Sequence, residues 1–346
     1  MIREAIMVKG FGKILIIALL GFCFAPPADA SLTSDINAIV TRKSQKNAHF
    51  AVRVVNASTG RTAYARYADE LMIPASNMKI ISSAAALHYL GPNYEFTTKV
   101  GLRGRTLVVI GGGDPLLGDP ETDEKHGRKP GRLFADIAGA LAENGVKSLD
   151  EIIIDTAFFD DNGVCPNWSA DDLNQDYACE VSGLNYNLNC IRVSAKRYGS
   201  KAIVYVEPQT NYFTFVNKMK SVSKGKSAIA VLHNAQPNKL LVKGKCAPGA
   251  GASADVAIKK PAGFFGVLLA ENLSRAGIRV PKQVTQRYTG KEKGIKIIRT
   301  YKTPMADVLK RCNTDSLNLA AEAFIKTISA ENTAGRINGE WPHGQT

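Results

Sequence analysis

The chain has 346 residues, of which 45% are hydrophobic, and a formal net charge of +13. A chain of this length and composition can bury a sizeable core, so disorder is excluded as its main state and two or three domains are expected. The basic excess bears on association with anionic partners and not on fold. Nucleic acid is not an expected partner, because no recognition motif for it is present.

Residues 1–30 have the pattern of a secretory signal peptide. Basic residues precede an apolar run from Ile14 to Phe24, and Ala28-Asp29-Ala30 supplies small residues for cleavage after Ala30. A membrane anchor is the alternative, but the run is well short of the roughly 20 residues that span a bilayer. The sequence therefore predicts export to the periplasm.

Export would place the cysteines that follow the signal in a compartment where disulfides persist. We favour a bridge between Cys165 and Cys179, which share a polar, loop-like segment, and as a second choice one between Cys190 and Cys246. Connectivity is not deducible from sequence, so other pairings stay open. Cys312 falls in a helical pattern and is expected to be a buried, inert thiol.

The mature chain begins with a predicted helix, Leu32 to Arg42, and an alternating strand, Phe50 to Val55. The turn residues 56–60 follow that strand and predict a hairpin. A helix from Asn77 to Leu90 comes next, with Ser76 at its start.

From about Tyr94 to Glu292 the pattern changes to short strand-like runs separated by Gly, Pro and Asp clusters, which indicates a β-rich region. The clearest runs are Thr106–Ile110, Ile152–Ile154, Ile203–Val206 and Ala228–Leu232. A helix is predicted from Ala262 to Ala276 within the region. A strand near Ile295–Tyr301 and helices over Pro304–Ile328, broken around Asn313–Asp315, complete the pattern.

The tetrapeptide Ser76-Asn77-Met78-Lys79 places a serine and a lysine on one face of a helix start. A lysine that is partly desolvated can take the serine proton, and the free N–H groups of the helix start favour an oxyanion. Alone, S-x-x-K also fits a capping serine and an exposed lysine. Ile80, Ile81 and Leu87 favour a buried central helix, which would preorganise the pair.

A second motif, Ser316-Leu317-Asn318, lies between two predicted helices. Enzymes of the S-x-x-K type pair it with an S-x-N motif, whose serine relays a proton and whose asparagine forms hydrogen bonds. By itself the tripeptide also fits a helix cap.

With these motifs the chain resembles the low-molecular-mass class C penicillin-binding proteins, which are D-alanyl-D-alanine carboxypeptidases and endopeptidases. The resemblance covers roughly Ser31 to Trp341. The segments that match the pattern of that family are Pro74–Lys79, Ala84–Leu87, Leu90–Pro92, Thr106–Pro115, Asp155–Phe159 and Leu309–Glu322.

The resemblance implies that Ser76 is the acylated nucleophile and Lys79 its general base. It implies that Ser316 passes a proton to the leaving amine and that Asn318 holds the substrate. Asp155 and Phe159 resemble insertion residues that recognise a diamino-acid side chain, although an Asp after a strand also fits a turn.

The fold that the resemblance implies is α+β: a β-lactamase/transpeptidase-like domain, with helices around an antiparallel sheet, split by a β-rich insertion of one or two domains. We expect a signal peptide at 1–30, the first part of the transpeptidase-like domain at 31–93, the insertion at 94–292 and the second part at 293–346.

The third motif of this family, K-T-G, does not occur between Ser316 and Thr346. Its strand supplies a cation, a hydroxyl and an oxyanion donor, and loss of one such donor costs about 10²–10³-fold in rate. The expectation is a chain truncated before that motif, either a fragment or a decayed copy. A folded non-catalytic relative is the alternative.

The predicted function is a serine-type carboxypeptidase or endopeptidase that acts on peptidoglycan stem peptides and is acylated by β-lactams, without metal or cofactor. The histidines are scattered and no C-x-x-C occurs. A β-lactamase would lack the long insertion. The rival from another class is a non-catalytic wall-binding protein that uses a basic run, Lys218 to Lys245, for wall or membrane-surface association, although such runs are usually solvated faces.

Overall fold

The computed structural model describes residues 28–234, 236, 238–249, 251–289, 294–333 and 338–344. The chain divides into two compact units, Met1–Ala75 and Ser76–Thr346. The predicted signal peptide lies outside the described residues, except that its last three residues begin a helix. Within the described part, no helix is both long and apolar enough to cross a bilayer.

The first unit contains the predicted hairpin. Helix α2 (Ala28–Val40) and a short 3-10 turn η1 (Lys43–Gln45) precede β1 (Val52–Val55) and β2 (Thr62–Arg66), which pair antiparallel. The Asn56 side chain accepts the N–H groups of Ser58 and Thr59 at 3.0 Å each, which fixes the turn between the strands. The Tyr64 hydroxyl donates to Asn37 Oδ1 at 2.7 Å and ties β2 to α2.

A five-stranded mixed sheet organises the second unit. Its order is β12 (Thr285–Gln286), β5 (Glu151–Asp155), β4 (Thr106–Ile110), β3 (Glu95–Arg103) and β13 (Lys296–Pro304). Strand β3 pairs antiparallel with both β4 and β13, whereas β4, β5 and β12 run parallel. Segments about 200 residues apart in sequence, β3 and β13, therefore lie side by side.

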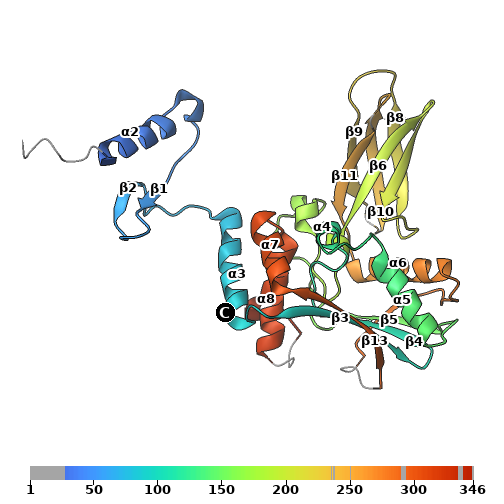
Figure 1. Cartoon of the computed structure of the whole chain (residues 1–346). Coiled ribbons are helices and arrows are strands. Elements are labelled where there is room, and N and C mark those ends of the chain that lie inside the picture. Colours follow the sequence, from blue (N-terminus) through green and yellow to red (C-terminus); the bar gives the residue numbers. More distant parts are fainter. Residues whose placement is uncertain are drawn as a thin grey trace, which may run out of the picture. The chain divides into compact units, whose positions relative to one another are not determined.

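Two helices cover one face of this sheet, α5 (Arg132–Glu143) and α6 (Pro261–Arg275) (Figure 1). The buried residues Phe134, Ile137 and Leu141 of α5 recur at helical spacing, and Phe265 of α6 meets Phe134 with ring centroids 5.6 Å apart. Helix α6 confirms the helix predicted from Ala262 to Ala276. Helix α5 and the shorter α4 (Pro120–Lys125) lie in a region predicted to be strand-like, so that prediction was incomplete.

The strands between β5 and α6 form two three-stranded sheets, which Figure 1 shows standing together as a β-rich lobe. One has the order β11-β6-β7 and the other β8-β10-β9. Their bounds are β6 Cys190–Tyr198, β7 Lys201–Glu207, β8 Thr214–Ser221, β9 Ala228–His233, β10 Lys239–Cys246 and β11 Ala252–Ala257. The buried residues Val193, Val231 and Val242 belong to one apolar core with the sheet and helices above. The prediction of a β-rich region is confirmed, as is the α+β class.

A group of three helices completes the unit: α3 (Met78–Tyr89), α7 (Met305–Thr314) and α8 (Asn318–Asn332). Ala86, Phe96, Val308, Ala320 and Phe324 form their shared apolar core. The short helix α9 (Trp341–Gly344) packs on α8.

The expectation that Ile80, Ile81 and Leu87 make α3 a buried central helix is wrong in this structure. Lys79, Ser83 and Ala86, at helical spacing, face α7 and α8 and are buried. Ile80 and Ile81 are 63% and 62% exposed, because the helical period turns them away from those two helices. The helix is therefore covered along one face within its unit.

One buried carboxyl in this unit gives a prediction for stability against pH. Asp114 is 1% exposed and accepts hydrogen bonds from the Leu116 N–H at 2.9 Å and the Thr303 hydroxyl at 2.6 Å. Burial is the largest cause that raises its pKa, from 3.8 to about 6. Because the pKa of Asp114 is higher in the folded chain than in the unfolded chain, proton binding by this carboxyl favours folding. The contribution is complete below the unfolded pKa of 3.8 and is lost as the pH rises through the folded pKa of about 6.

We expect the free energy of unfolding of the native chain, minus that of the Asp114→Asn variant, to fall by about 2 kcal/mol between pH 4 and pH 7. The variant keeps an acceptor for Leu116 and carries no titrating group at this position. Urea unfolding of both chains at several pH values measures the difference. A difference that does not change with pH would contradict the assignment.

Candidate active site

The structure brings the two predicted motifs together at the start of α3. Ser76 lies in the 3-10 turn η2 (Ala75–Asn77), and Lys79 lies one turn further along. The Lys79 Nζ donates to Ser76 Oγ at 3.3 Å and to Asn318 Oδ1 at 2.5 Å. The Ser316 hydroxyl, 240 residues from Ser76 in sequence, donates to Ser76 Oγ at 2.8 Å. All four predicted side chains are thus within hydrogen-bonding reach of another member of the group.

The four groups differ in their access to solvent. Lys79 is 8% exposed, whereas Ser76 and Ser316 are exposed and Asn318 is half-buried. The two hydroxyls therefore lie open above a lysine amine that is largely shielded from water.

Ser316 has a backbone conformation that is unusual for a residue with a Cβ atom. Its φ is +57°, in the left-handed region, which costs of order 1–2 kcal/mol for such a residue. The Arg311 side chain holds the surrounding turn by ion pairs to Asp315 at 2.8 Å and to the buried Asp119 at 3.0 Å, while the Leu317 N–H donates to the Arg311 carbonyl. The fold thus maintains a strained turn at the point where the Ser316 hydroxyl meets Ser76.

Asn313 supplies a second connection between α7 and α3. Its amide donates to the Ser83 hydroxyl at 2.8 Å, and Ser83 lies one turn after Lys79 on the buried face of α3. The Ser83 hydroxyl in turn donates to Cys312 Sγ at 3.8 Å, and Cys312 is buried, as its helical context predicts. These contacts fix the helix of the S-x-x-K motif against the helix that leads to the S-x-N motif.

Both ends of the Asn318 side chain are in use. Its Oδ1 accepts the Lys79 amine, and its Nδ2 donates to the main-chain carbonyl of Tyr177 at 2.8 Å. Tyr177 belongs to the 3-10 turn η4 (Asp176–Ala178), in the segment between β5 and β6. Sequence reasoning missed this contact, because a backbone carbonyl carries no side-chain signature.

Glu322 extends the group by one turn of α8. Its Oε2 accepts the Trp341 indole N–H at 2.6 Å. Burial is the main cause that raises the pKa of Glu322, while its hydrogen bonds and the charges of Lys79 and Lys326 act in the opposite direction. The carboxyl therefore lies in the electrostatic field of the candidate general base, at a position that the i, i+4 spacing from Asn318 could have indicated.

Lys326 lies a further turn along the same face of α8 and is fully buried. Its Nζ donates to Asp160 Oδ1 at 2.5 Å and to the Asn162 carbonyl at 2.8 Å, and lies 4.1 Å from the centroid of the Trp341 ring. Burial lowers the pKa of Lys326, and the Asp160 carboxylate opposes that shift. Asn318, Glu322 and Lys326 thus form one polar stripe on α8, leading inward from Lys79.

The structure does not bring Asp155 and Phe159 into contact with these four side chains. Asp155, at the end of β5, is 4% exposed, and its carboxylate accepts the N–H groups of Ala157 and Thr289 and the Thr289 hydroxyl. Phe159 is 1% exposed in a cluster with Trp341, and Lys326 Nζ lies 5.4 Å from its ring centroid. Both side chains make structural contacts, so the geometry lends no support to their predicted part in substrate recognition.

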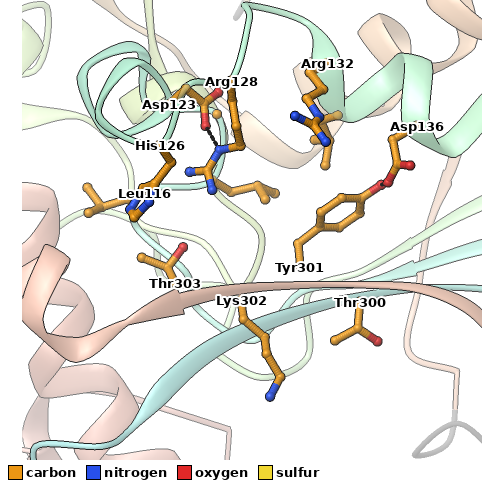
Figure 2. Close-up of a pocket in the computed structure, with 13 residues that line it drawn as sticks. Leu116, Asp123, His126, Arg128, Arg132, Asp136, Thr300, Tyr301, Lys302 and Thr303 are labelled. Atoms are coloured by element: carbon orange, nitrogen blue, oxygen red, sulfur yellow. Dashed lines mark hydrogen bonds and ion pairs between the residues drawn. The ribbon is translucent and has the colours of Figure 1, made fainter.

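A separate cavity of about 520 Å³ lies between the α4–α5 region and β13 (Figure 2). None of the four motif residues lines it. Its polar groups largely satisfy one another: Arg128 pairs with Asp123 at 2.7 Å, and the Tyr301 hydroxyl donates to Asp136 at 2.8 Å. The candidate active site is therefore the exposed group around Ser76 and not this cavity. The described residues also contain no group of His, Cys, Asp and Glu placed to hold a metal ion.

The family model of the D-Ala-D-Ala carboxypeptidase 3 (S13) family matches residues 32–342. The chain belongs to this family, and its resemblance to the class C penicillin-binding proteins is confirmed. A D-alanyl-D-alanine carboxypeptidase of Actinomadura sp. (strain R39) is 28% identical over 282 residues, which are 74% of this chain and 50% of that protein. A carboxypeptidase of Mycobacterium tuberculosis is 26% identical over 153 residues, 43% of this chain and 32% of that one.

Two solved structures share the fold. Both are of penicillin-binding protein 4 from Haemophilus influenzae, one of them complexed with a β-lactam. The first has a TM-score of 0.69 and 19% identity, the second 0.61 and 18%. Each match covers 85% of this chain and about two thirds of the other, 65% and 64%. The chain spans half or less of the length of the two curated relatives.

The ion pair between Lys326 of α8 and Asp160 predicts that removing the two partners lowers stability by unequal amounts. Lys326 is 0% exposed, whereas the Asp160 side chain is 31% exposed. Asp160→Asn removes the carboxylate that the buried ammonium hydrogen-bonds and should lower the free energy of unfolding by about 3–5 kcal/mol. Lys326→Met leaves a carboxylate that can reach water, so its cost should be roughly half of that or less.

Urea unfolding of both variants measures the two costs. Asp161→Asn is the matched control, since this neighbouring carboxylate is exposed and its loss should change stability by no more than about 0.5 kcal/mol. Equal costs for Asp160→Asn and Lys326→Met would show that burial of the ammonium is not what makes the pair asymmetric.

Proposed function

We propose that this protein is a serine-type carboxypeptidase of the periplasm that cleaves the D-alanyl-D-alanine ends of peptidoglycan stem peptides through an acyl-enzyme on Ser76. The observation that carries the proposal is the convergence of Lys79 Nζ and Ser316 Oγ on Ser76 Oγ, at 3.3 and 2.8 Å. The family to which the chain belongs and the printed names of its relatives favour the same activity. Export rests on the predicted signal peptide.

In the proposed first step, the neutral Lys79 amine takes the Ser76 proton over the 3.3 Å contact while Ser76 Oγ attacks the carbonyl carbon of the penultimate residue. The free amides at the start of α3 would stabilise negative charge that develops on the carbonyl oxygen, and such donors lower the barrier. Asn318 holds the Lys79 amine in position through its Oδ1.

In the second step, the C–N bond breaks and the Ser316 hydroxyl, which contacts Ser76 Oγ, passes a proton to the leaving amine of D-alanine. The Lys79 ammonium returns to Ser316 the proton that it took from Ser76, so that both groups regain their starting protonation states. Water then attacks the Ser76 ester, with Lys79 again as the base, and frees the shortened peptide. A cross-link peptide presents the same type of carbonyl, so endopeptidase activity would follow the same steps. A β-lactam presents a strained amide to Ser76 and would acylate it likewise.

Labelling with a fluorescent penicillin tests the proposal. We expect a covalent band for the native chain, no band for Ser76→Ala, and acylation slowed by about 10²-fold or more in Lys79→Ala, since this is the usual contribution of a general base. Ser82→Ala is the matched control, because this serine also lies on α3 and its hydroxyl bonds only to the Met78 carbonyl among the contacts described. Absence of a band from a chain that circular dichroism shows to be folded would count against catalysis.

A second candidate function, binding to the wall without catalysis, has a specific observation in its favour. In the parallel pairing of β8 and β10, Lys218 is in register with Lys243 and Lys220 with Lys245. All four are exposed, so two pairs of like charges lie side by side on one face of the sheet. Such pairs are unfavourable in isolation, and an anionic polymer would relieve the repulsion.

Sedimentation with purified peptidoglycan sacculi tests this surface. We expect binding that weakens as salt is raised, and at least a several-fold loss at low salt when these four lysines are changed to Gln, because exposed charges act mainly through screened attraction. The control carries the same change of charge at four scattered exposed positions, Lys129, Lys147, Lys201 and Lys282. Equal binding by the two variants would identify the lysines of β8 and β10 as an ordinary solvated face.

A further inference from the structure

Two cysteines, Cys179 and Cys190, lie next to the turn η4, which contains the carbonyl that accepts the Asn318 amide. Asn318 Nδ2 donates to the carbonyl of Tyr177 in η4, and Cys179 follows η4 directly. Cys190 begins β6, and its thiol donates to the carbonyl of Asp176, the first residue of η4, at 3.5 Å. Two adjacent carbonyls of η4 therefore accept hydrogen bonds: that of Tyr177 from Asn318 and that of Asp176 from the Cys190 thiol.

Neighbouring contacts show that the chain around Cys179 runs beside the chain around Cys190. The Asn189 side-chain amide donates to the Glu180 carbonyl at 2.8 Å, which links the residues next to the two cysteines. Cys179 is buried in the apolar cluster that contains Phe159, and Cys190 packs against that cluster. A hydrogen bond between the two thiols, together with burial, raises the pKa of Cys190 well above its ordinary value.

The other cysteines have different surroundings. Cys165 lies in the same cluster, but its thiol is hydrogen-bonded to Glu322, and burial raises its pKa to about 11. Cys246 is buried at the end of β10, in another sheet. All five described cysteines are free thiols in this structure. The two bridges favoured by the sequence, Cys165–Cys179 and Cys190–Cys246, are not formed, and the neighbour of Cys179 is Cys190.

We propose that Cys179 and Cys190 form a reversible disulfide that locks η4 and thereby the carbonyl that orients Asn318. The effect on catalysis rests on the function proposed for Ser76, whereas the disulfide itself does not. The disulfide would make the position of the Tyr177 carbonyl depend on the redox state of the surroundings.

The oxidant is a small-molecule disulfide such as oxidised glutathione. The thiolate of Cys190, the more exposed of the two, attacks one sulfur of the oxidant and releases one glutathione thiol. The Cys179 thiolate then attacks Cys190 Sγ and releases the second. The two cysteines lose two protons and two electrons in total, and one glutathione disulfide is reduced to two thiols.

Peptide mapping of the full chain tests the pairing. The chain is incubated with oxidised glutathione, alkylated, digested without reductant and examined by mass spectrometry. We expect a linked species that contains Cys179 and Cys190, formed about tenfold faster per pH unit between pH 7 and pH 9, because the thiolate is the attacking form. The Cys246→Ser variant should form the same species and Cys190→Ser should not. A Cys165–Cys179 species, or complete alkylation of all the cysteines, would overturn the proposal.

Hydrogen exchange tests the lock without reference to activity. In the oxidised chain, amide exchange of residues 176–178 should slow at least several-fold relative to the reduced chain, in the native sequence and in Cys246→Ser but not in Cys190→Ser. Equal exchange in both redox states would refute the lock. If exchange slows but no form of the chain is labelled by penicillin, the proposed function fails while the redox pair stands.

Discussion

The amine of Lys79 is the contact on which the arrangement of the site depends. An ammonium or amine that is 8% exposed must find partners inside the protein, since its hydration is lost. It finds them in Ser76 Oγ, in the turn η2 just before α3, and in Asn318 Oδ1, at the start of α8. Two segments that are far apart in sequence thus meet at one nitrogen atom, and the small residues Ala86 and Ala320 in the shared core allow α3 and α8 to approach closely.

The sheet explains how residues 240 positions apart reach each other. Helix α3 ends just before β3, and β13 ends where α7 begins. Because β3 and β13 pair antiparallel, with Pro304 opposite Glu95, both helices extend from the same end of this strand pair. The Met305 N–H donates to the Tyr94 carbonyl at 2.9 Å and closes the junction. The chain between β3 and β13 can therefore form a large β-rich lobe without displacing Ser316 from Ser76.

The parts of the site that depend on local spacing could be predicted from the sequence, and those that depend on distant backbone could not. The spacing of Ser76 and Lys79 on one helix start fixes their proximity, and the resemblance to a family supplied Ser316 and Asn318. The Tyr177 carbonyl, the left-handed φ of Ser316 and the Cys179–Cys190 contact arise from tertiary folding and have no sequence signature. Asp155 was predicted to bind substrate through the resemblance to a family, whereas its position after a strand also fitted the buried turn that the structure shows. Helix α5 was missed because Gly and Ala interrupt its apolar spacing and the flanking runs are strand-like.

The polar stripe on α8 shows why the site is coupled to the interior of its unit. Lys79, Glu322, Lys326 and Asp160 alternate in sign from the exposed hydroxyls inward, and the pKa of Glu322 responds to both lysines. Each of these charges would be costly to bury alone, and the neighbouring groups of opposite sign offset part of that cost for Glu322 and Lys326. Trp341 joins two of them, since its indole N–H binds Glu322 while its ring lies against the Lys326 amine. A change at Trp341 therefore removes a hydrogen bond from Glu322 and a ring contact from Lys326, so it acts on the carboxyl that interacts with Lys79 without touching Lys79 itself.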